Sequence, residues 1–237
     1  MTFCIGIKVK DGLIGLADTR IVSGNERITA TKISTHQHGK HSLFLMTSGL
    51  RSVRDKALAY FEKALGKTED FKNLYEAIGV FADQIKRVEK EDGDSLLRSG
   101  INFNLHALVG GQLEDDKEQK LYMIYPQGNW VEVSRSTPFY IIGESGYGKP
   151  ILERTIEFES SLPDALTAAF LAFNATITCA VDVDYPIDVV FYKKDSYEMA
   201  ATRFEREEMN EISKWWHQNI KRLASELPAE WHKKVLG

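Results

Sequence analysis

Alternating and continuous apolar runs mark the first block of predicted elements. In residues 3–9 every second position is apolar, which predicts a half-buried strand. The turn dipeptide Asp11-Gly12 then leads into residues 13–17, a nearly all-apolar strand of the kind that is buried on both faces. Two more strands are expected to complete the block, with polar loops before and between them: strands 28–34 and 42–47, loops 23–26 and 35–41.

Apolar residues at helical spacing follow this block. They predict one helix from Leu50 to about Ala64 and a second from about Asp70 to Glu89, with the polar segment 90–94 as a loop. The second half of the chain repeats the arrangement. Strands are expected over 102–109, 121–125, 130–133, 139–142, 186–192 and 197–204, and helices over 150–158 and from a capping box at Ser161 to about Ile177.

A last amphipathic helix is expected over about 205–227, ended by Pro228. Its apolar residues recur every three or four positions and predict one buried stripe, made of Met209, Ile212, Trp216, Ile220, Leu223 and Leu227. Trp215 and Trp231 fall outside that stripe. Large exposed apolar groups usually mark contacts, so we expect either a subunit interface here or packing onto the protomer's own sheet.

The order of elements indicates the fold class. Strands come in blocks, and each block is followed by helices, which argues against alternating βαβ units and for packed antiparallel sheets flanked by helices. The sequence therefore predicts an α+β fold, a four-layer αββα sandwich of two antiparallel sheets. No repeat, linker or low-complexity tract suggests a second domain, so we expect a single domain over residues 1–237.

Composition narrows the classes of function. The net charge is −4 and no basic run stands out, so we expect no nucleic-acid partner. No apolar run reaches the roughly 18 residues of a membrane span, and the N-terminus lacks the pattern of a signal peptide. The two cysteines, Cys4 and Cys179, do not form a disulfide framework and suit a reducing compartment. We expect a cytoplasmic protein without a membrane partner.

Two motifs invite a metal or nucleotide interpretation. His36, His38 and His41 could ligate zinc, but they flank a Gly-Lys turn with no Cys or carboxylate nearby, and a solvated hairpin loop is the preferred interpretation. The Gly-rich tract 143–150 lacks the phosphate-binding pattern, because its Lys is followed by Pro. We therefore expect no metal and no cofactor.

The second residue carries the strongest candidate chemistry. Thr2 follows Met1 directly and is small enough for Met1 to be trimmed. Trimming would leave a Thr with a free α-amine, which can act as nucleophile and as its own general base. An amine with a pKa of about 7.7–8.0 is partly neutral at cellular pH, and a nearby Lys would lower that pKa. The residues thus allow an N-terminal threonine nucleophile.

The order of motifs in the first thirty-two residues resembles the β-subunits of proteasomes. Thr2 precedes an apolar strand and a Lys-Asp-Gly turn, a second strand ends in Asp18-x-Arg20, and a further strand carries Lys32. The resemblance implies that Thr2 is the nucleophile, Asp18 the orienting acid and Lys32 the activating base. It covers essentially the full chain and implies the fold of N-terminal-nucleophile hydrolases, which agrees with the predicted layers.

The same resemblance assigns two further residues. Gly49, at a strand-to-helix turn, matches the glycine whose amide forms the oxyanion hole, although a Gly that only eases a tight turn is the alternative. The tract Gly-Glu-Ser-x-Tyr-Gly-Lys-Pro resembles the turn in bacterial members of the family whose Ser hydrogen-bonds the nucleophile. This implies that role for Ser145.

The supporting residues depart from the family pattern. A second Asp and a Ser near the chain end support the terminal Thr in proteasome β-subunits, but residues 178–188 lack that Ser. We expect Asp182 to replace part of this support, together with Arg20 of the Asp-x-Arg motif. An imperfect supporting set could cost much of the rate. No leader precedes Thr2, so activation is expected to need only Met1 removal.

Three functions follow from these expectations. The first is a threonine-type peptidase or amidohydrolase that works on peptides or unfolded proteins in a self-compartmentalising homo-oligomer, a ring or open spiral, with an ATP-dependent unfoldase as candidate partner. The second is a weakly active or inactive scaffold subunit of the same fold, and the third an amidase for a small molecule. Replacing Lys32 with Ala is expected to abolish turnover and leave the fold intact, as for an exposed contact.

Overall fold

The chain divides into two units. The computed structural model describes residues 2–23, 26–65 and 71–236, and its contacts separate Met1–Arg203 from Phe204–Gly237. The first unit holds both large sheets and four helices, and the second holds the C-terminal helices. The single domain expected over residues 1–237 stays a prediction.

The first sheet is built around the N-terminal hairpin. Its five strands have the order β10-β1-β2-β11-β12, with antiparallel pairing of β1 to both β10 and β2 and of β2 to β11. Their bounds are β1 Phe3–Val9, β2 Gly12–Asp18, β10 Phe139–Gly143, β11 Ile187–Lys193 and β12 Met199–Phe204. The prediction that β1 is only half buried was wrong, because every residue of β1 and of β2 is buried. Lys8 is accommodated there by ion pairs to Glu118 and Glu132.

The second sheet has the order β5-β6-β7-β8-β9 and is also antiparallel. Its strands are β5 Ile33–His38, β6 His41–Gly49, β7 Leu105–Gln112, β8 Lys120–Ile124 and β9 Trp130–Glu132. A separate hairpin joins β3 Arg20–Ser23 to β4 Glu26–Thr29. The expected strand over 28–34 is therefore two strands interrupted before Ile33. The predicted loop 35–41 is mostly strand, because an edge strand such as β5 tolerates polar residues.

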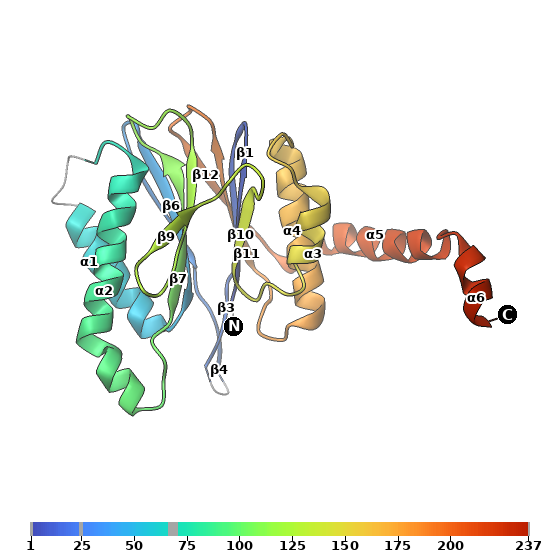
Figure 1. Cartoon of the computed structure of the whole chain (residues 1–237), viewed down its shortest axis with the longest axis horizontal. Helices are drawn as coiled ribbons and strands as arrows, with labels where there is room; N and C mark the ends of the chain where they lie inside the picture. Colours follow the sequence, from blue (N-terminus) through green and yellow to red (C-terminus); the bar gives the residue numbers. More distant parts are fainter. Residues whose placement is uncertain (1, 24–25, 66–70, 237) are drawn as a thin grey trace. The chain divides into compact units, whose positions relative to one another are not determined.

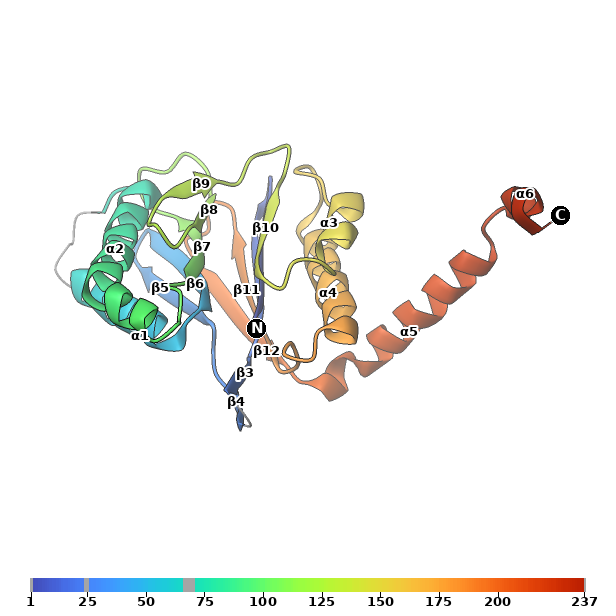
Figure 2. The same ribbon diagram turned by 60° about the horizontal axis from the view of Figure 1, so that its bottom comes forward.

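Four helices cover the outer faces of the two sheets. Figures 1 and 2 show α1 and α2 against the second sheet and α3 and α4 against the first, with the sheets face to face between them. The helices are α1 Arg51–Leu65, α2 Leu74–Arg98, α3 Lys149–Thr155 and α4 Leu162–Cys179. One core cluster lies between α1, α2 and the second sheet, and another contains residues of both sheets, including Cys4, Phe44 and Leu108. This confirms the predicted αββα sandwich.

α2 is longer than expected, whereas α4 begins where it was predicted. α2 continues through the segment 90–94 to Arg98, and Glu91 and Asp92 on it pair with Lys56 of α1, which explains why so polar a stretch stays helical. α4 begins at the predicted cap, where the Ser161 hydroxyl oxygen accepts the Asp164 N–H. By length and composition α4 could cross a membrane, yet it packs against β1 and β2 and buries one side there.

The unit Phe204–Gly237 is dominated by α5, Arg206–Ser225, followed by a short 3-10 helix Ala229–His232 and α6 Lys233–Leu236. Glu205 and Glu208 cap α5 reciprocally, as helix-starting pairs do. The helix was predicted correctly. None of its described residues is buried within this single chain, so the buried stripe stays a prediction. Trp215 is 61% exposed in this single chain, and whether it lies at a subunit interface stays a prediction. The side chain of Trp231 lies outside the described ones.

Candidate functional site

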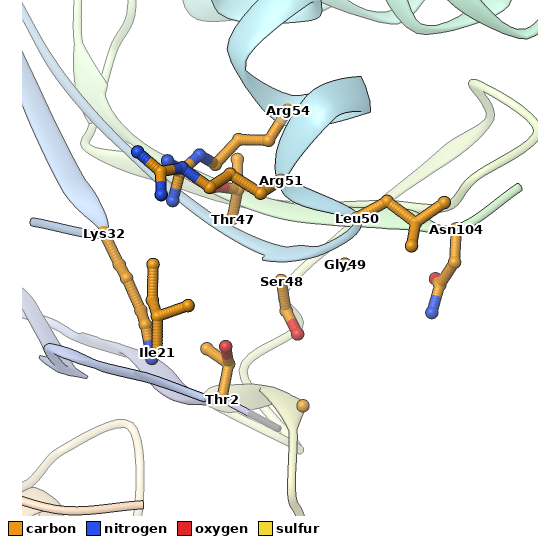
Figure 3. Close-up of a pocket in the computed structure, with 11 residues that line it drawn as sticks. Thr2, Ile21, Lys32, Thr47, Ser48, Gly49, Leu50, Arg51, Arg54 and Asn104 are labelled. Atoms are coloured by element: carbon orange, nitrogen blue, oxygen red, sulfur yellow. The ribbon is translucent and has the colours of Figure 1, made fainter. Parts of the chain in front are cut away.

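Thr2 opens onto a cavity of about 410 Å³ in the first unit, where the N-terminal end of β1 meets the C-terminal end of β6. Figure 3 shows Thr2 between the end of the Lys32 side chain and the Ser48 hydroxyl in that view. Three of the predicted site residues, Thr2, Lys32 and Gly49, line this one cavity. The remaining lining residues are Ile21, Thr47, Ser48, Leu50, Arg51, Arg54, Asn104 and Gly143.

The backbone around Thr2 is held from two sides. The Thr2 carbonyl oxygen accepts the Glu144 N–H at 2.7 Å, and the Phe3 N–H donates to Asp18 Oδ1 at 2.8 Å. Gly143, opposite Phe3 in the ladder, has φ +89°, and a Cβ there would overlap with the Thr2 carbonyl. Glycine is therefore required at this close approach. Met1 lies outside the described residues, so its removal stays a prediction.

Asp18 and Lys32 form a buried ion pair beside the cavity. Lys32 Nζ donates to Asp18 Oδ1 at 2.6 Å and to the Arg20 carbonyl oxygen at 2.7 Å. The Asp18 side chain is 0% exposed and the Lys32 side chain is 2% exposed. Burial raises the pKa of the Asp18 carboxyl, while the Lys32 ammonium and the N–H groups of Phe3 and Arg20 oppose that rise. The predicted contact between Asp18 and Lys32 is confirmed. The expected hydrogen bond from Lys32 to the Thr2 hydroxyl stays a prediction.

Gly49 ends β6 at the edge of the cavity. Its φ is +143°, and a Cβ would overlap with the Asn104 carbonyl oxygen on the neighbouring chain segment. The conformation explains the glycine without reference to chemistry, so the tight-turn interpretation has direct support. Gly49 also lines the cavity that contains Thr2, where an oxyanion donor would have to lie. The oxyanion role itself stays a prediction.

Ser48, and not Ser145, lines the cavity that contains Thr2. Ser145 is exposed and lines two other cavities, both shared with Lys149 and separate from the Thr2 cavity. Ser48 instead lines the Thr2 cavity, and its hydroxyl lies near the Gly143 backbone. Sequence reasoning missed Ser48, although its position directly before Gly49 was a usable signal. The predicted hydrogen bond from Ser145 to the nucleophile stays a prediction.

Arg20 links the ion pair to the segment 181–184. Its guanidinium donates to the Val181 carbonyl oxygen at 2.9 Å and pairs with Asp184 at 2.8 Å, while its backbone contacts both Asp18 and Lys32. Arg20 thus holds two parts of the chain together, and its supporting role in catalysis stays a prediction. Asp184 is the acid in contact with it here, and the supporting role assigned to Asp182 stays a prediction.

Two basic residues of α1 also face the cavity and were missed by the sequence interpretation. Arg51 directly follows Leu50, Arg54 lies one turn further along α1, and both line the cavity that contains Thr2. Cys4 is close to this site in sequence, but burial raises the pKa of its thiol far above the usual range. A buried, protonated thiol is a poor nucleophile, so Thr2 is the better candidate.

The histidine motif shows a packing role. His36 lies on β5 with its ring edge-on to Phe61, 6.1 Å between centroids, and burial lowers its pKa. Within the part of the chain that the structure describes, no three His, Cys, Asp or Glu side chains form a group that could hold a metal ion.

Comparisons with known proteins agree with this geometry. The family model described as Proteasome subunit matches residues 2–190. The Anbu (Gly-1) mutant from Hyphomicrobium sp. strain MC1 has a similar structure, with TM-score 0.88 and 26% identity over 96% of this chain and 99% of that one. Anbu (ancestral beta-subunit) from Yersinia bercovieri gives 0.88 and 26% over 95% and 97%. The Anbu complex from Pseudomonas aeruginosa, described as a helical assembly, gives 0.89 and 27% over 95% and 97%. The search of curated proteins found no match.

Proposed function

The chain belongs to the proteasome family, and from that premise we propose that it is a threonine-type peptidase subunit in which Thr2, freed of Met1, hydrolyses peptide amides. The observation that carries the proposal is the position of Thr2 in a cavity with Lys32, which Asp18 holds in a buried ion pair. A nucleophile, a fixed cation and an open space for a substrate carbonyl thus lie together.

The proposed reaction begins with attack of the Thr2 hydroxyl oxygen on the substrate carbonyl carbon, while the Thr2 α-amine takes the hydroxyl proton. The positive charge of Lys32 lowers the pKa of that amine, so that more of it is neutral and able to accept a proton. The negative oxygen that forms would face the Gly49 amide. The amine then gives the proton to the leaving nitrogen, an ester to Thr2 remains, and water hydrolyses it to regenerate the hydroxyl.

We further propose that the protein works as a homo-oligomer. The similar Anbu complex from Pseudomonas aeruginosa is described as a helical assembly, which supports an open spiral over a closed ring. Substrates of peptide or unfolded-protein type, an ATP-dependent unfoldase and a cytoplasmic location complete the proposal. Light scattering at micromolar concentration tests the assembly, and a monomer would contradict it.

A second candidate function is a proteasome-like subunit without turnover. The place of Ser145, outside the Thr2 cavity, and the departure in residues 178–188 favour it. A third, an amidase for a small molecule, would be active as a single protomer.

Modification by a covalent probe separates the first two candidates. We expect a peptide epoxyketone to add one inhibitor mass to the wild-type protein, because the reagent joins both the hydroxyl and the free amine of an N-terminal Thr. Thr2→Ala is the matched control and should stay unmodified. Intact mass of protein from its native host should also lack Met1. Retention of Met1 on all molecules would exclude Thr2 as nucleophile, since an acylated amine cannot serve as base.

A further inference from the structure

The cavity that holds Thr2 carries two guanidinium groups that the proposed reaction does not use. Arg51 and Arg54 belong to the first turn of α1 and line the cavity together with Lys32. Figure 3 shows both side chains running from the helix toward the Lys32 side of the cavity. We propose that they select substrates with an acidic side chain, Asp or Glu, on the residue whose carbonyl Thr2 attacks. This inference rests on the proposed function.

The charges around the cavity do not cancel. Lys32 is neutralised by Asp18, with 2.6 Å between the charged atoms. Arg51 and Arg54 share a single carboxylate, because both pair with Asp55, at 3.5 Å and 2.7 Å. One positive charge is therefore left over at the cavity wall. The first turn of α1 contains no acidic residue, so the positive end of the helix dipole adds to it.

Burial makes this charge effective. The Arg54 side chain is only 14% exposed, whereas Arg51 is 57% exposed. A charge that is partly shielded from water interacts more strongly with a substrate carboxylate than an exposed one does. Guanidinium groups also bind carboxylates through two parallel hydrogen bonds, which favours Asp and Glu over their amides. Arg54 is thus the better shielded charge, while Arg51 is the one held less closely by Asp55, and we expect both to contact the substrate carboxylate.

The remaining walls suit the stem of an acidic side chain. Ile21 and Leu50 provide apolar surface for its methylene groups, and Thr47 adds a small polar contact. A volume of about 410 Å³ is enough for one side chain with its backbone. A basic side chain in the same space would meet Arg54 and Lys32 and be repelled.

A matched pair of fluorogenic peptides tests the inference. They differ only in Glu or Gln at the cleaved residue, and the fluorophore amide removes any free C-terminal carboxylate. We expect kcat/KM for the Glu peptide to exceed that for the Gln peptide by about tenfold or more, as for a hydrogen bond to a charged group. In Arg51→Gln/Arg54→Gln the ratio should fall to about one.

Arg98→Gln is the charge-matched control, because Arg98 ends α2 and does not line the cavity. It should leave the wild-type ratio unchanged. Equal cleavage of the Glu and Gln peptides by the wild-type protein, or a ratio that survives the double substitution, would overturn the inference. So would preference for a neutral or basic residue.

A binding measurement separates this inference from the proposed function. Thr2→Ala cannot turn over substrate by the proposed route, so fluorescence anisotropy of a dye-labelled peptide amide ending in Glu or Gln reports selection alone. Tighter binding of the Glu peptide, weakened by salt and by Arg54→Gln, supports the inference even if the wild-type protein cleaves nothing. Cleavage of peptides without any Glu preference in binding would retain the proposed function and reject the inference.

Discussion

Two clusters of opposite charges, one beside Thr2 and one between α1 and α2, show how burial changes what an ion pair does. Asp18 and Lys32 are almost completely buried, and the carboxylate also accepts two backbone N–H groups. Lys56 pairs with Glu91 and Asp92 on α2, and these three side chains are 31% to 38% exposed. Water competes with the second cluster and hardly reaches the first.

The comparison corrects an expectation from the sequence. Lys32 was expected to behave as an exposed contact whose loss leaves the fold intact, but its side chain is 2% exposed. Removing one member of a buried pair leaves the other charged group buried without its partner, which costs far more than losing a surface pair. The Asp18–Lys32 pair is therefore expected to contribute both to the free energy of unfolding and to peptide hydrolysis. A test of its role in hydrolysis must measure both quantities.

The largest effect is expected for Lys32→Met. We expect hydrolysis of a fluorogenic peptide to fall by about a hundredfold to ten-thousandfold, because the Thr2 α-amine would lose the positive charge that tunes it as the acid–base group. We also expect the free energy of unfolding to fall by about 3–5 kcal/mol, because Asp18 is left buried and unpaired. Urea denaturation and initial rates measure both.

The double variant Asp18→Asn/Lys32→Met distinguishes the loss of activity from the loss of stability. It removes both charges, so part of the lost stability should return while the activity does not. Recovery of activity together with stability would mean that the pair only ties two strands together. In that case Lys32 would not be an activating base.

The second largest effect is expected for Gly143→Ala. The new Cβ would overlap with the Thr2 carbonyl, so either β10 or Thr2 must shift. A shift of about 1 Å at the nucleophile costs on the order of a hundredfold in rate. Gly39→Ala is the control, because Gly39 also has positive φ, +56°, but its Cβ would meet no atom within 4 Å. Equal loss of activity in both variants would contradict this account.

The sequence predicted the fold well where the structure of a segment follows from its own residue pattern. It predicted the fold poorly where contacts with another segment determine burial or helix length. The layers followed from the order of strands and helices, but the burial of β1 on both faces depends on helices and a sheet that a single strand pattern does not show. The end of α2 was missed because Lys56, on another helix, stabilises Glu91 and Asp92. The polar strand β5 was missed because it lies at a sheet edge.

The candidate site shows the same division. Motifs and family resemblance placed Asp18 beside Lys32 and brought Thr2 and Gly49 to one cavity. They did not find Ser48, and the arginines of α1 were also missed, because which face of that helix borders the cavity follows only from its packing on the second sheet.

A smaller effect is expected at the link between Arg20 and Asp184. Their side chains are 23% and 17% exposed, so removing the ion pair should cost about 1 kcal/mol of stability. A double-mutant cycle with Arg20→Gln and Asp184→Asn measures the coupling free energy between them. A coupling energy of zero would show that the ion pair with Asp184 contributes nothing, which would leave the bond to the Val181 carbonyl and the backbone contacts as the role of Arg20.

The smallest effect is expected on the helix surface. Lys56→Gln should lower the thermal midpoint by about 1–2 °C and leave peptide hydrolysis unchanged, because the pair is exposed to solvent. The cations beside Glu91, first Lys56 and then Arg87, lower the pKa of that carboxyl from 4.5 to about 2. The contribution of the Glu91 carboxylate to the free energy of unfolding is therefore present above pH 4.5 and is lost as the pH falls toward 2.

Thermal unfolding of the wild-type protein and Lys56→Gln between pH 5 and pH 2.5 measures this contribution. The difference between their midpoints should shrink as Glu91 is protonated. A difference that grows in acid would contradict the assignment of the pKa shift to Lys56.

The attachment of Thr2 to β1 limits how the N-terminus can vary in length. Phe3 is fixed by its pairing with Gly143 and by its bond to Asp18, so Thr2 is the first residue outside a fixed ladder. One residue inserted between Thr2 and Phe3 would move the hydroxyl by about 3.3 Å and turn it to the other face of the strand. Replacing the side chain of residue 2 can therefore reduce activity by degrees, whereas adding or removing a residue at this end takes the hydroxyl out of the cavity altogether.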